Sequence, residues 1–228
     1  KLMKVSLKIK LGILLMSFLT VMTITILATF WVVSLQKDYA LIVNLAGRQR
    51  MLTQKMTKEV LVIARETDGG DKAKDYRESL MKTRELFDKT LSALISGGET
   101  VDSSNKPVTL PAASNAQILK ILKGSSELWN EFNKKIGLLL KGGIAVGSED
   151  FNNALTFIEA NNINLLKGMN DVTGIYEKEA EKKVYLLKIV QVWAFIVTLI
   201  VAITAFWLAN RIIIKPLGHM ADHLNSVA

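Results

Sequence analysis

The chain has 228 residues, with 29 Lys and Arg against 21 Asp and Glu, and a formal net charge of +8 at pH 7. It contains no cysteine and two histidines, His219 and His223. This composition excludes a disulfide framework, a thiol nucleophile, cysteine-ligated metal sites and a histidine-based catalytic dyad elsewhere in the chain. Half of the residues are hydrophobic and the mean hydropathy is +0.26, which is high for a soluble domain and indicates membrane-spanning segments.

Two apolar segments are long enough to cross a bilayer. Residues 11–35 and residues 189–210 contain no charged residue, and a helix needs about 20 apolar residues to span the hydrocarbon core. Because lysines precede the first segment, a secretory signal peptide is the alternative. Its apolar run is longer than the roughly 7–15 residues of such a peptide, and no small-residue cleavage site follows it. We therefore expect two transmembrane helices.

Basic residues flank both spans on the same side. The positive-inside rule then places both termini in the cytoplasm and residues 36–188 outside it. Because these residues account for much of the net charge, nucleic-acid binding need not be invoked and no such partner is expected. The flanking residues are Lys1, Lys4, Lys8, Lys10, Arg211 and Lys215.

The segment between the spans is divided by glycine-bearing breaks at residues 68–71, 97–111 and 142–148, with Ser148 as a plausible helix N-cap. No part of it shows sustained alternation of apolar and polar residues, so no sheet is expected and 97–111 is predicted to be a loop. The prediction is an all-α protein with an extracytoplasmic, antiparallel, up-down-up-down four-helix bundle. Its helices are expected at about 36–67, 72–96, 112–141 and 148–188.

Each of these helices has apolar residues at spacings of three and four, which predicts one buried face per helix. No glycine or proline interrupts the passage from the outer helices into the spans, so those helices are expected to be continuous with the membrane helices. The predicted core residues are, in chain order, Leu45, Leu52, Met56, Val60 and Ile63; Tyr76, Leu80, Phe87, Leu91 and Leu94; Ile118, Leu122, Ser125, Trp129, Phe132, Ile136 and Leu139; and Phe151, Leu155, Ile158, Leu165, Met169, Val172 and Tyr176.

The first of these helices also has a second face, formed by Val43, Gly47, Arg50, Gln54 and Thr57. A mid-helix glycine costs about 1 kcal/mol relative to alanine, and close approach of a partner helix, aided by the neighbouring alanine, would explain it. The same helix of a second subunit is the simplest partner. The two arginines would then face each other, and a small oxyanion between their guanidinium groups would relieve the repulsion. A merely solvated arginine is the alternative.

The segment Asn44-x-Ala46-Gly47-x-x-Arg50-Met51-x-Thr53-Gln54 resembles the signature helix of PilJ-type sensor domains, which occur in bacterial chemoreceptors and in related nitrate/nitrite sensor kinases. Residues 162–170, followed by Tyr176, are similar to the last-helix pattern of that family. The resemblance implies a homodimer in the bacterial inner membrane with a periplasmic sensor domain. It also implies that Arg50 of each subunit binds nitrate across the interface. The implied ligand site is Arg50, Gly47, Ala46, Asn44 and Gln54.

The segment Arg211-Ile-Ile-Ile-Lys-Pro216-Leu217, with Met220 and Leu224 after it, is similar to the start of a HAMP linker. A basic juxtamembrane stop before any amphipathic helix is the alternative. His219 and His223 share this segment, but without a suitable acidic partner we expect no metal site there. The predicted organisation is a cytoplasmic tail (1–10), a first span (11–35), a sensor domain (36–188), a second span (189–210) and a truncated HAMP start (211–228).

These patterns predict a transmembrane signal-transduction receptor and not an enzyme, because no nucleophile–base pair, metal cluster or phosphate-binding glycine loop is present. No cofactor is expected, and the cytoplasmic output domain, a chemoreceptor hairpin or a kinase, is expected to be missing from the chain. Nitrate is the first expected ligand. Two alternatives stay open: the same receptor architecture with another small organic ligand, and a membrane dimerisation or adaptor module without a ligand.

Overall fold

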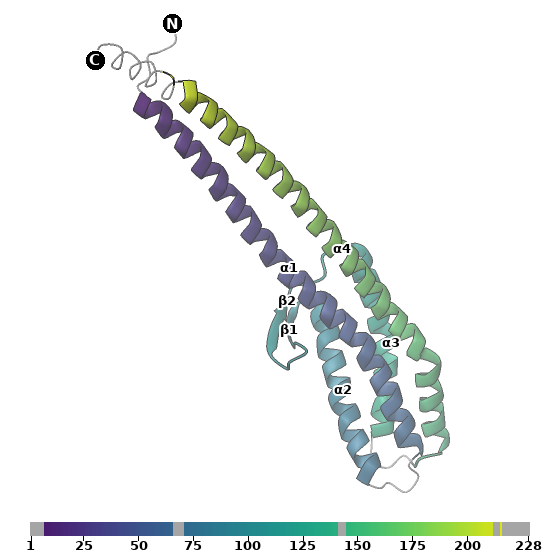
Figure 1. The fold of residues 1–228 in the computed structure, drawn as a ribbon. Coiled ribbons are helices and arrows are strands. Elements are labelled where there is room, and N and C mark those ends of the chain that lie inside the picture. Colours follow the sequence, from purple (N-terminus) through teal and green to yellow (C-terminus); the bar gives the residue numbers. More distant parts are fainter. Residues whose placement is uncertain (1–6, 66–70, 141–144, 212–214, 216–228) are drawn as a thin grey trace, which may run out of the picture. The chain divides into compact units, whose positions relative to one another are not determined.

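The computed structural model describes residues 7–65, 71–140, 145–211 and 215. Helices dominate the chain (Figure 1). The elements follow the order α1 (Leu7–Arg65), α2 (Asp71–Ser96), β1 (Gly98–Val101), β2 (Pro107–Leu110), α3 (Ala116–Leu140) and α4 (Glu149–Ala209). The helix ranges agree with the all-α prediction, and α1 and α4 each run without interruption from the region between the apolar segments into those segments.

The helix ends have local causes. The side chain of Asn115 accepts hydrogen bonds from the backbone N–H groups of Gln117 (2.8 Å) and Ile118 (3.1 Å), which caps the start of α3. Ser148, the predicted N-cap of α4, accepts a bond from the N–H of Phe151 at 3.3 Å. Gly97 ends α2 with φ +76°, a conformation that favours glycine. A Cβ at Gly97 would also lie 2.9 Å from a backbone nitrogen of the segment after β2.

The chain divides into two units, residues 1–36 with 182–228, and residues 37–181. In the first unit, large apolar side chains such as Ile13, Phe30 and Phe206 are exposed. Both long helices are long and apolar enough to cross a membrane, and their apolar windows are not buried within the protein. Exposed apolar surface of this extent is typical of lipid-facing helices. Residues 1–6 and all of the predicted HAMP start except Arg211 and Lys215 lie outside the described residues.

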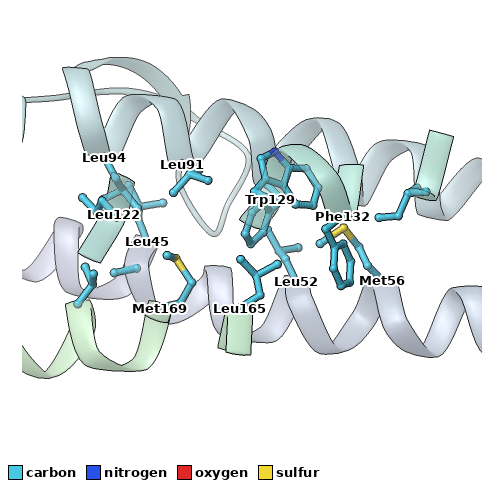
Figure 2. Close-up of a cluster of buried hydrophobic side chains, with 14 of the residues drawn as sticks. Leu45, Leu52, Met56, Leu91, Leu94, Leu122, Trp129, Phe132, Leu165 and Met169 are labelled. Atoms are coloured by element: carbon cyan, nitrogen blue, oxygen red, sulfur yellow. The ribbon is translucent and has the colours of Figure 1, made fainter. Parts of the chain in front are cut away.

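The second unit has one hydrophobic core to which all four helices contribute (Figure 2). The face predicted for the first helix is buried, and so is every residue of the stripe predicted for the third. In the second and fourth helices the stripes are buried except at Tyr76 and Leu155, which are partly exposed. The centre contains the tilted pair Phe87 and Trp129, with ring centroids 4.3 Å apart. Burial of apolar side chains at roughly 25 cal/mol per Å² is the main force that holds these helices together.

The expectation that no sheet is present was wrong. β1 and β2 form an antiparallel hairpin in which Gly98 pairs with Leu110 and Val101 with Pro107. Strands of four residues are too short to show a reliable alternation, and these two also depend on contacts with α1 and α2. Thr100 is buried and its hydroxyl lies 2.8 Å from that of Thr90 on α2. At the turn, Asp102 accepts bonds from the N–H groups of two residues that follow it, which closes the hairpin.

Candidate functional site

The signature segment of the sequence, residues 44–54, lies within α1 in the second unit. The buried face of this segment is wider than the predicted apolar face, because it includes the polar residues Gln49 and Thr53. Polar side chains of α1 also contact α2 and α4. Ala46 is fully buried in the core of its own unit, so it does not lie on the exposed face together with Gly47. Thr57 is largely buried as well. The exposed part of the predicted second face is therefore narrower than expected, with Gly47 and Arg50 half-buried and Gln54 exposed.

Two hydrogen bonds join this part of α1 to α4. Nη1 of Arg50 donates to Oδ1 of Asn170 at 2.7 Å. Nε2 of Gln54 donates to Oδ1 of Asn162 at 2.8 Å. The two segments with a family resemblance, 44–54 and 162–170, therefore lie side by side although more than 100 positions separate them.

A shallow cavity of about 520 Å³ lies along this junction. Its lining has two cationic side chains and no carboxylate, together with two amides that can accept or donate hydrogen bonds. Apolar side chains form the rest, and two of these, Met51 and Ile163, are more than half exposed. The lining residues are Arg50, Met51, Gln54, Ile163, Leu166, Lys167 and Asn170.

The guanidinium group of Arg50 has five N–H donors in a planar fork, and one of them is used by Asn170. That bond fixes the direction of the fork and leaves donors for an oxyanion. Lys167 adds a second positive charge to the same cavity. The arrangement is suited to binding a small anion.

Among the described residues, no steric contact requires a glycine at position 47. A Cβ at that position would meet only Nη2 of Arg50, at 3.5 Å, which is ordinary van der Waals contact. Asn44, the remaining predicted site residue, is exposed one turn before Gly47 and does not line the cavity. Of the five predicted site residues, the cavity thus brings together Arg50 and Gln54.

Arg48, which the helical wheel places away from Arg50, has a structural role that the sequence did not indicate. Its guanidinium donates to the carbonyl oxygens of Val101 (2.5 Å) and Asp102 (2.7 Å) and to the hydroxyl of Thr90 (3.2 Å). Burial lowers the pKa of Arg48, and the attraction of Asp102 opposes that shift. Its neighbour Gln49 is buried and donates to the carbonyl of Phe87 at 2.8 Å. Arg48 therefore attaches the hairpin to α1.

Sequence reasoning quoted Asn170 in a motif but did not place it in the site. The hydrogen bond between Arg50 and Asn170 depends on how α4 is rotated about its axis relative to α1. A pattern of neighbouring residues in the sequence does not predict that rotation.

Within the described residues, no group of three His, Asp or Glu side chains could hold a metal ion. The two histidines considered above, His219 and His223, lie outside the described residues.

Comparison with known proteins places this geometry in context. The family model described as "PilJ: Type IV pili methyl-accepting chemotaxis transducer N-term" matches residues 31–150. The match covers the signature segment of α1, all of α2, the hairpin and α3, and it ends before the 162–170 segment of α4. A search of curated proteins gave no match.

Proposed function

The chain belongs to the PilJ family, the N-terminal domain of type IV pili methyl-accepting chemotaxis transducers, and its role is therefore sensory. We propose that it is a transmembrane receptor for a small oxyanion, and that nitrate is the first ligand to test. The observation that carries the ligand proposal is the Arg50 cavity, which has two cations and no carboxylate in its lining. A planar oxyanion can accept two parallel bonds from one guanidinium fork.

The proposed receptor is a homodimer whose two-fold axis passes beside the exposed face of α1. Three features support this arrangement. No steric contact with the described residues requires glycine at position 47. Met51 and Ile163 are exposed at the cavity, and the cavity itself is open on one side. In such a dimer Arg50 of one protomer faces Arg50 of its partner, and the anion neutralises the charge between them.

The proposed topology places both termini in the cytoplasm and the 37–181 unit in the periplasm of a bacterial inner membrane. The lysines before the first apolar segment and Arg211 after the second support this orientation. The signal would pass along α1 and α4, which are single helices of 59 and 61 residues, to a HAMP linker that begins near Pro216 and a cytoplasmic output domain. The Arg50–Asn170 bond gives the ligand a direct mechanical connection to α4.

The proposal is tested by isothermal titration of nitrate into the full chain in lipid nanodiscs. A charge-assisted hydrogen bond is worth about 1.5–3 kcal/mol, so Arg50→Ala should weaken binding by at least about tenfold. The matched control is Arg65→Ala, since Arg65 is an exposed arginine at the end of the same helix and does not line the cavity. Equal nitrate affinity in Arg50→Ala and Arg65→Ala would reject the oxyanion site.

Two further functions share the same fold. In the first, a small organic anion binds in the same cavity in place of nitrate. Calorimetric titration with acetate, as an organic anion, and with nitrate, nitrite and sulfate, as inorganic oxyanions, separates the two classes of ligand. A dimerisation or adaptor module without a ligand predicts no saturable binding by any member of the panel and no effect of Arg50→Ala beyond stability. The pair of cations in the cavity favours the sensor over the adaptor.

A further inference from the structure

A second arginine, Arg84 on α2, is oriented in a similar way to Arg50 on α1. Nε of Arg84 donates to Oδ1 of Asn133 on α3, as Nη1 of Arg50 donates to Oδ1 of Asn170 on α4. In both pairs the acceptor is a neutral amide on another helix, so it orients the guanidinium without cancelling the positive charge. The hydrogen bond to Asn133 also leaves the N–H donors of both Nη groups of Arg84 for another acceptor.

The carboxylates near Arg84 have other partners. Asp88 lies one turn after Arg84 on α2, but its Oδ1 accepts a hydrogen bond from the indole N–H of Trp129 at 2.7 Å. Glu131 on α3 forms an ion pair with Lys134 at 2.6 Å. The described part of the chain contains no ion pair of Arg84. Its guanidinium is therefore a half-buried charge to which no carboxylate of the described residues is paired.

A cavity of about 470 Å³ lies beside this guanidinium, between α2 and α3. It has no lining residue in common with the Arg50 cavity. Three cationic side chains line it against one carboxylate, which leaves an excess of positive charge. Among its lining residues only Glu131 and Lys134 are exposed, and the others are half-buried. The lining residues are Arg84, Glu131, Asn133, Lys134, Lys135, Gly137 and Leu138.

Gly137 leaves room for a ligand beside the guanidinium. A Cβ at this position would meet only Nη2 of Arg84, at 3.8 Å, so no steric contact with the described residues requires a glycine. Glycine inside a helix is less stable than alanine, which makes its presence here unexplained by packing. Gly47 has the same relation to Arg50, because its Cβ would meet only Nη2 of that arginine, at 3.5 Å. Both cavities thus have a guanidinium that a neutral amide orients and that lies next to a glycine.

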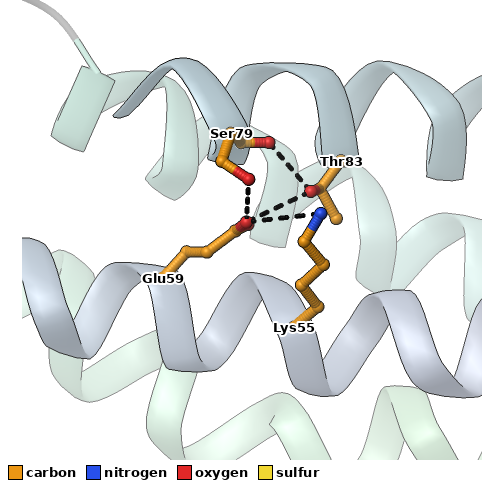
Figure 3. A network of polar contacts seen from close by, with 4 residues as sticks. All are labelled: Lys55, Glu59, Ser79 and Thr83. Carbon is orange, nitrogen blue, oxygen red and sulfur yellow. Dashed lines mark hydrogen bonds and ion pairs between the residues drawn. The ribbon is translucent and has the colours of Figure 1, made fainter. Parts of the chain in front are cut away.

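A buried charge does not by itself make a ligand site, as Glu59 on α1 shows (Figure 3). This residue is only 2% exposed. Its Oε1 accepts a hydrogen bond from Oγ of Ser79 at 2.5 Å and lies 3.6 Å from Nζ of Lys55. Its Oε2 has no hydrogen-bond partner among the described residues, but it is buried and a dissolved ligand cannot reach it. Arg84 differs from Glu59 because it lines a cavity.

We propose that the α2–α3 cavity is a second ligand site, which binds a small oxyanion with two negative charges. Two oxygens of the ligand would accept hydrogen bonds from the two Nη groups of Arg84, in the bidentate geometry that guanidinium groups favour. The lysines of the lining add positive charge, and their attraction at a given distance is about twice as large for a dianion as for a monoanion. The volume falls within the range of small-molecule sites, roughly 300–1,000 Å³.

The test is isothermal titration into the full chain in lipid nanodiscs, in a buffer without phosphate, with Arg50→Ala present so that the first site does not contribute. Sulfate represents an inorganic source of the dianion and succinate an organic one. At least one of them should bind saturably, once per chain, and nitrate should bind several-fold more weakly. Addition of Arg84→Ala should weaken dianion binding by about tenfold or more. The matched control is Lys89→Ala, which removes one positive charge from an exposed position of α2 that does not line the cavity.

A second variant keeps the test independent of the loss of Arg84. Gly137→Ala adds a methyl group next to Nη2 of Arg84 and should weaken dianion binding several-fold. The melting temperature should not fall, because alanine favours the helix more than glycine does. The control is Gly124→Ala on the same helix. A Cβ there would meet nothing within 4 Å and would not line the cavity, so dianion binding should be unchanged.

Failure of this site can be distinguished from failure of the Arg50 site. Nitrate binding to the chain with Arg50 intact tests only the first site, and Arg84→Ala should leave it unchanged because the two cavities share no residue. Three results would overturn the proposal: no saturable binding of sulfate or succinate without Arg50, nitrate binding there as tight as that of both dianions, or dianion binding that neither Arg84→Ala nor Gly137→Ala weakens.

Discussion

Nη1 of Arg50 on α1 and Oδ1 of Asn170 on α4 lie 2.7 Å apart, in a hydrogen bond between residues that are 120 positions apart in the chain. The amide is a neutral acceptor, so it orients the guanidinium without cancelling its charge. An oxyanion can therefore compete for the remaining donors. A carboxylate at position 170 would itself occupy the fork and remove the charge that attracts the ligand.

Replacement of Asn170 by aspartate is accordingly expected to weaken nitrate binding. Asn170→Asp should lower the affinity by about tenfold or more, because a charge-assisted bond of about 1.5–3 kcal/mol must be broken first. Asn170→Ala should change the affinity by only a few-fold. The control, Asn164→Asp, adds the same charge at an exposed position of α4 that does not line the cavity. Equal affinities in the two aspartate variants, measured by calorimetry, would show that Asn170 does not position Arg50.

Gly168 on α4 lies against the side chain of Ser125 on α3. A Cβ at this position would lie 2.2 Å from Oγ of Ser125 but 3.5 Å from its Cβ. Gly168→Ala should therefore destabilise the protein by about 1–3 kcal/mol through overpacking, and the double variant with Ser125→Ala should recover most of that loss. Thermal unfolding of the chain in detergent, followed by circular dichroism, measures both.

The matched control for this pair is Gly174→Ala on the same helix. A Cβ there would meet nothing within 4 Å, so the change should raise stability by up to about 1 kcal/mol through helix propensity. If Gly168→Ala behaves like Gly174→Ala, the close approach of the two helices at Gly168 is not present in solution.

Arg48 is expected to matter for stability and not for the ligand. Arg48→Ala leaves the carbonyls of Val101 and Asp102 without their donor and should cost about 1–3 kcal/mol. Hydrogen exchange of the backbone amides of β1 and β2 should accelerate, while nitrate affinity at a temperature well below unfolding stays nearly normal. Unchanged exchange in the hairpin would contradict its attachment through Arg48.

Tyr176 gives the unit a dependence on alkaline pH. Burial, followed by the charges of Glu179 and Tyr39, raises the pKa of Tyr176 from 10.0 to about 12. The unfolded chain therefore loses this proton before the folded chain does. The stabilisation is complete below about pH 10 and is lost as the pH rises toward 12. Tyr176→Phe should show a smaller fall in melting temperature between pH 9.5 and about 11.5 than the unaltered chain; an equal fall would mean that Tyr176 is not the titrating group.

The proposed dimer can be tested by single cysteines, because the chain has none of its own. Gln54→Cys, on the exposed side of the Arg50 cavity, should crosslink to the same residue of its partner under mild oxidation. Lys58→Cys is exposed on the α1–α2 side and is the control. Crosslinking at position 58 but not at 54 would place the axis on the other side of α1.

The sequence predicted the buried faces because apolar periodicity directly reflects burial, as Leu122 and Phe132 illustrate. It did not predict the hairpin, since β1 depends on Arg48, more than 50 positions earlier. Arg50 could be singled out on a helical wheel, whereas its bond to Asn170 depends on the relative rotation of two helices. Glu59 was missed although its position, seven residues after Leu52, lies on the predicted core face, where a charged residue is unusual.

Whether two Arg50 side chains share one oxyanion is decided by the stoichiometry of nitrate binding. Calorimetric titration of the full chain in nanodiscs should give one nitrate per two chains. Arg50→Lys should lose about tenfold or more in affinity, because an ammonium lacks the bidentate fork. One nitrate per chain, or an Arg50→Lys variant that binds as tightly as the unaltered chain, would reject the shared oxyanion site.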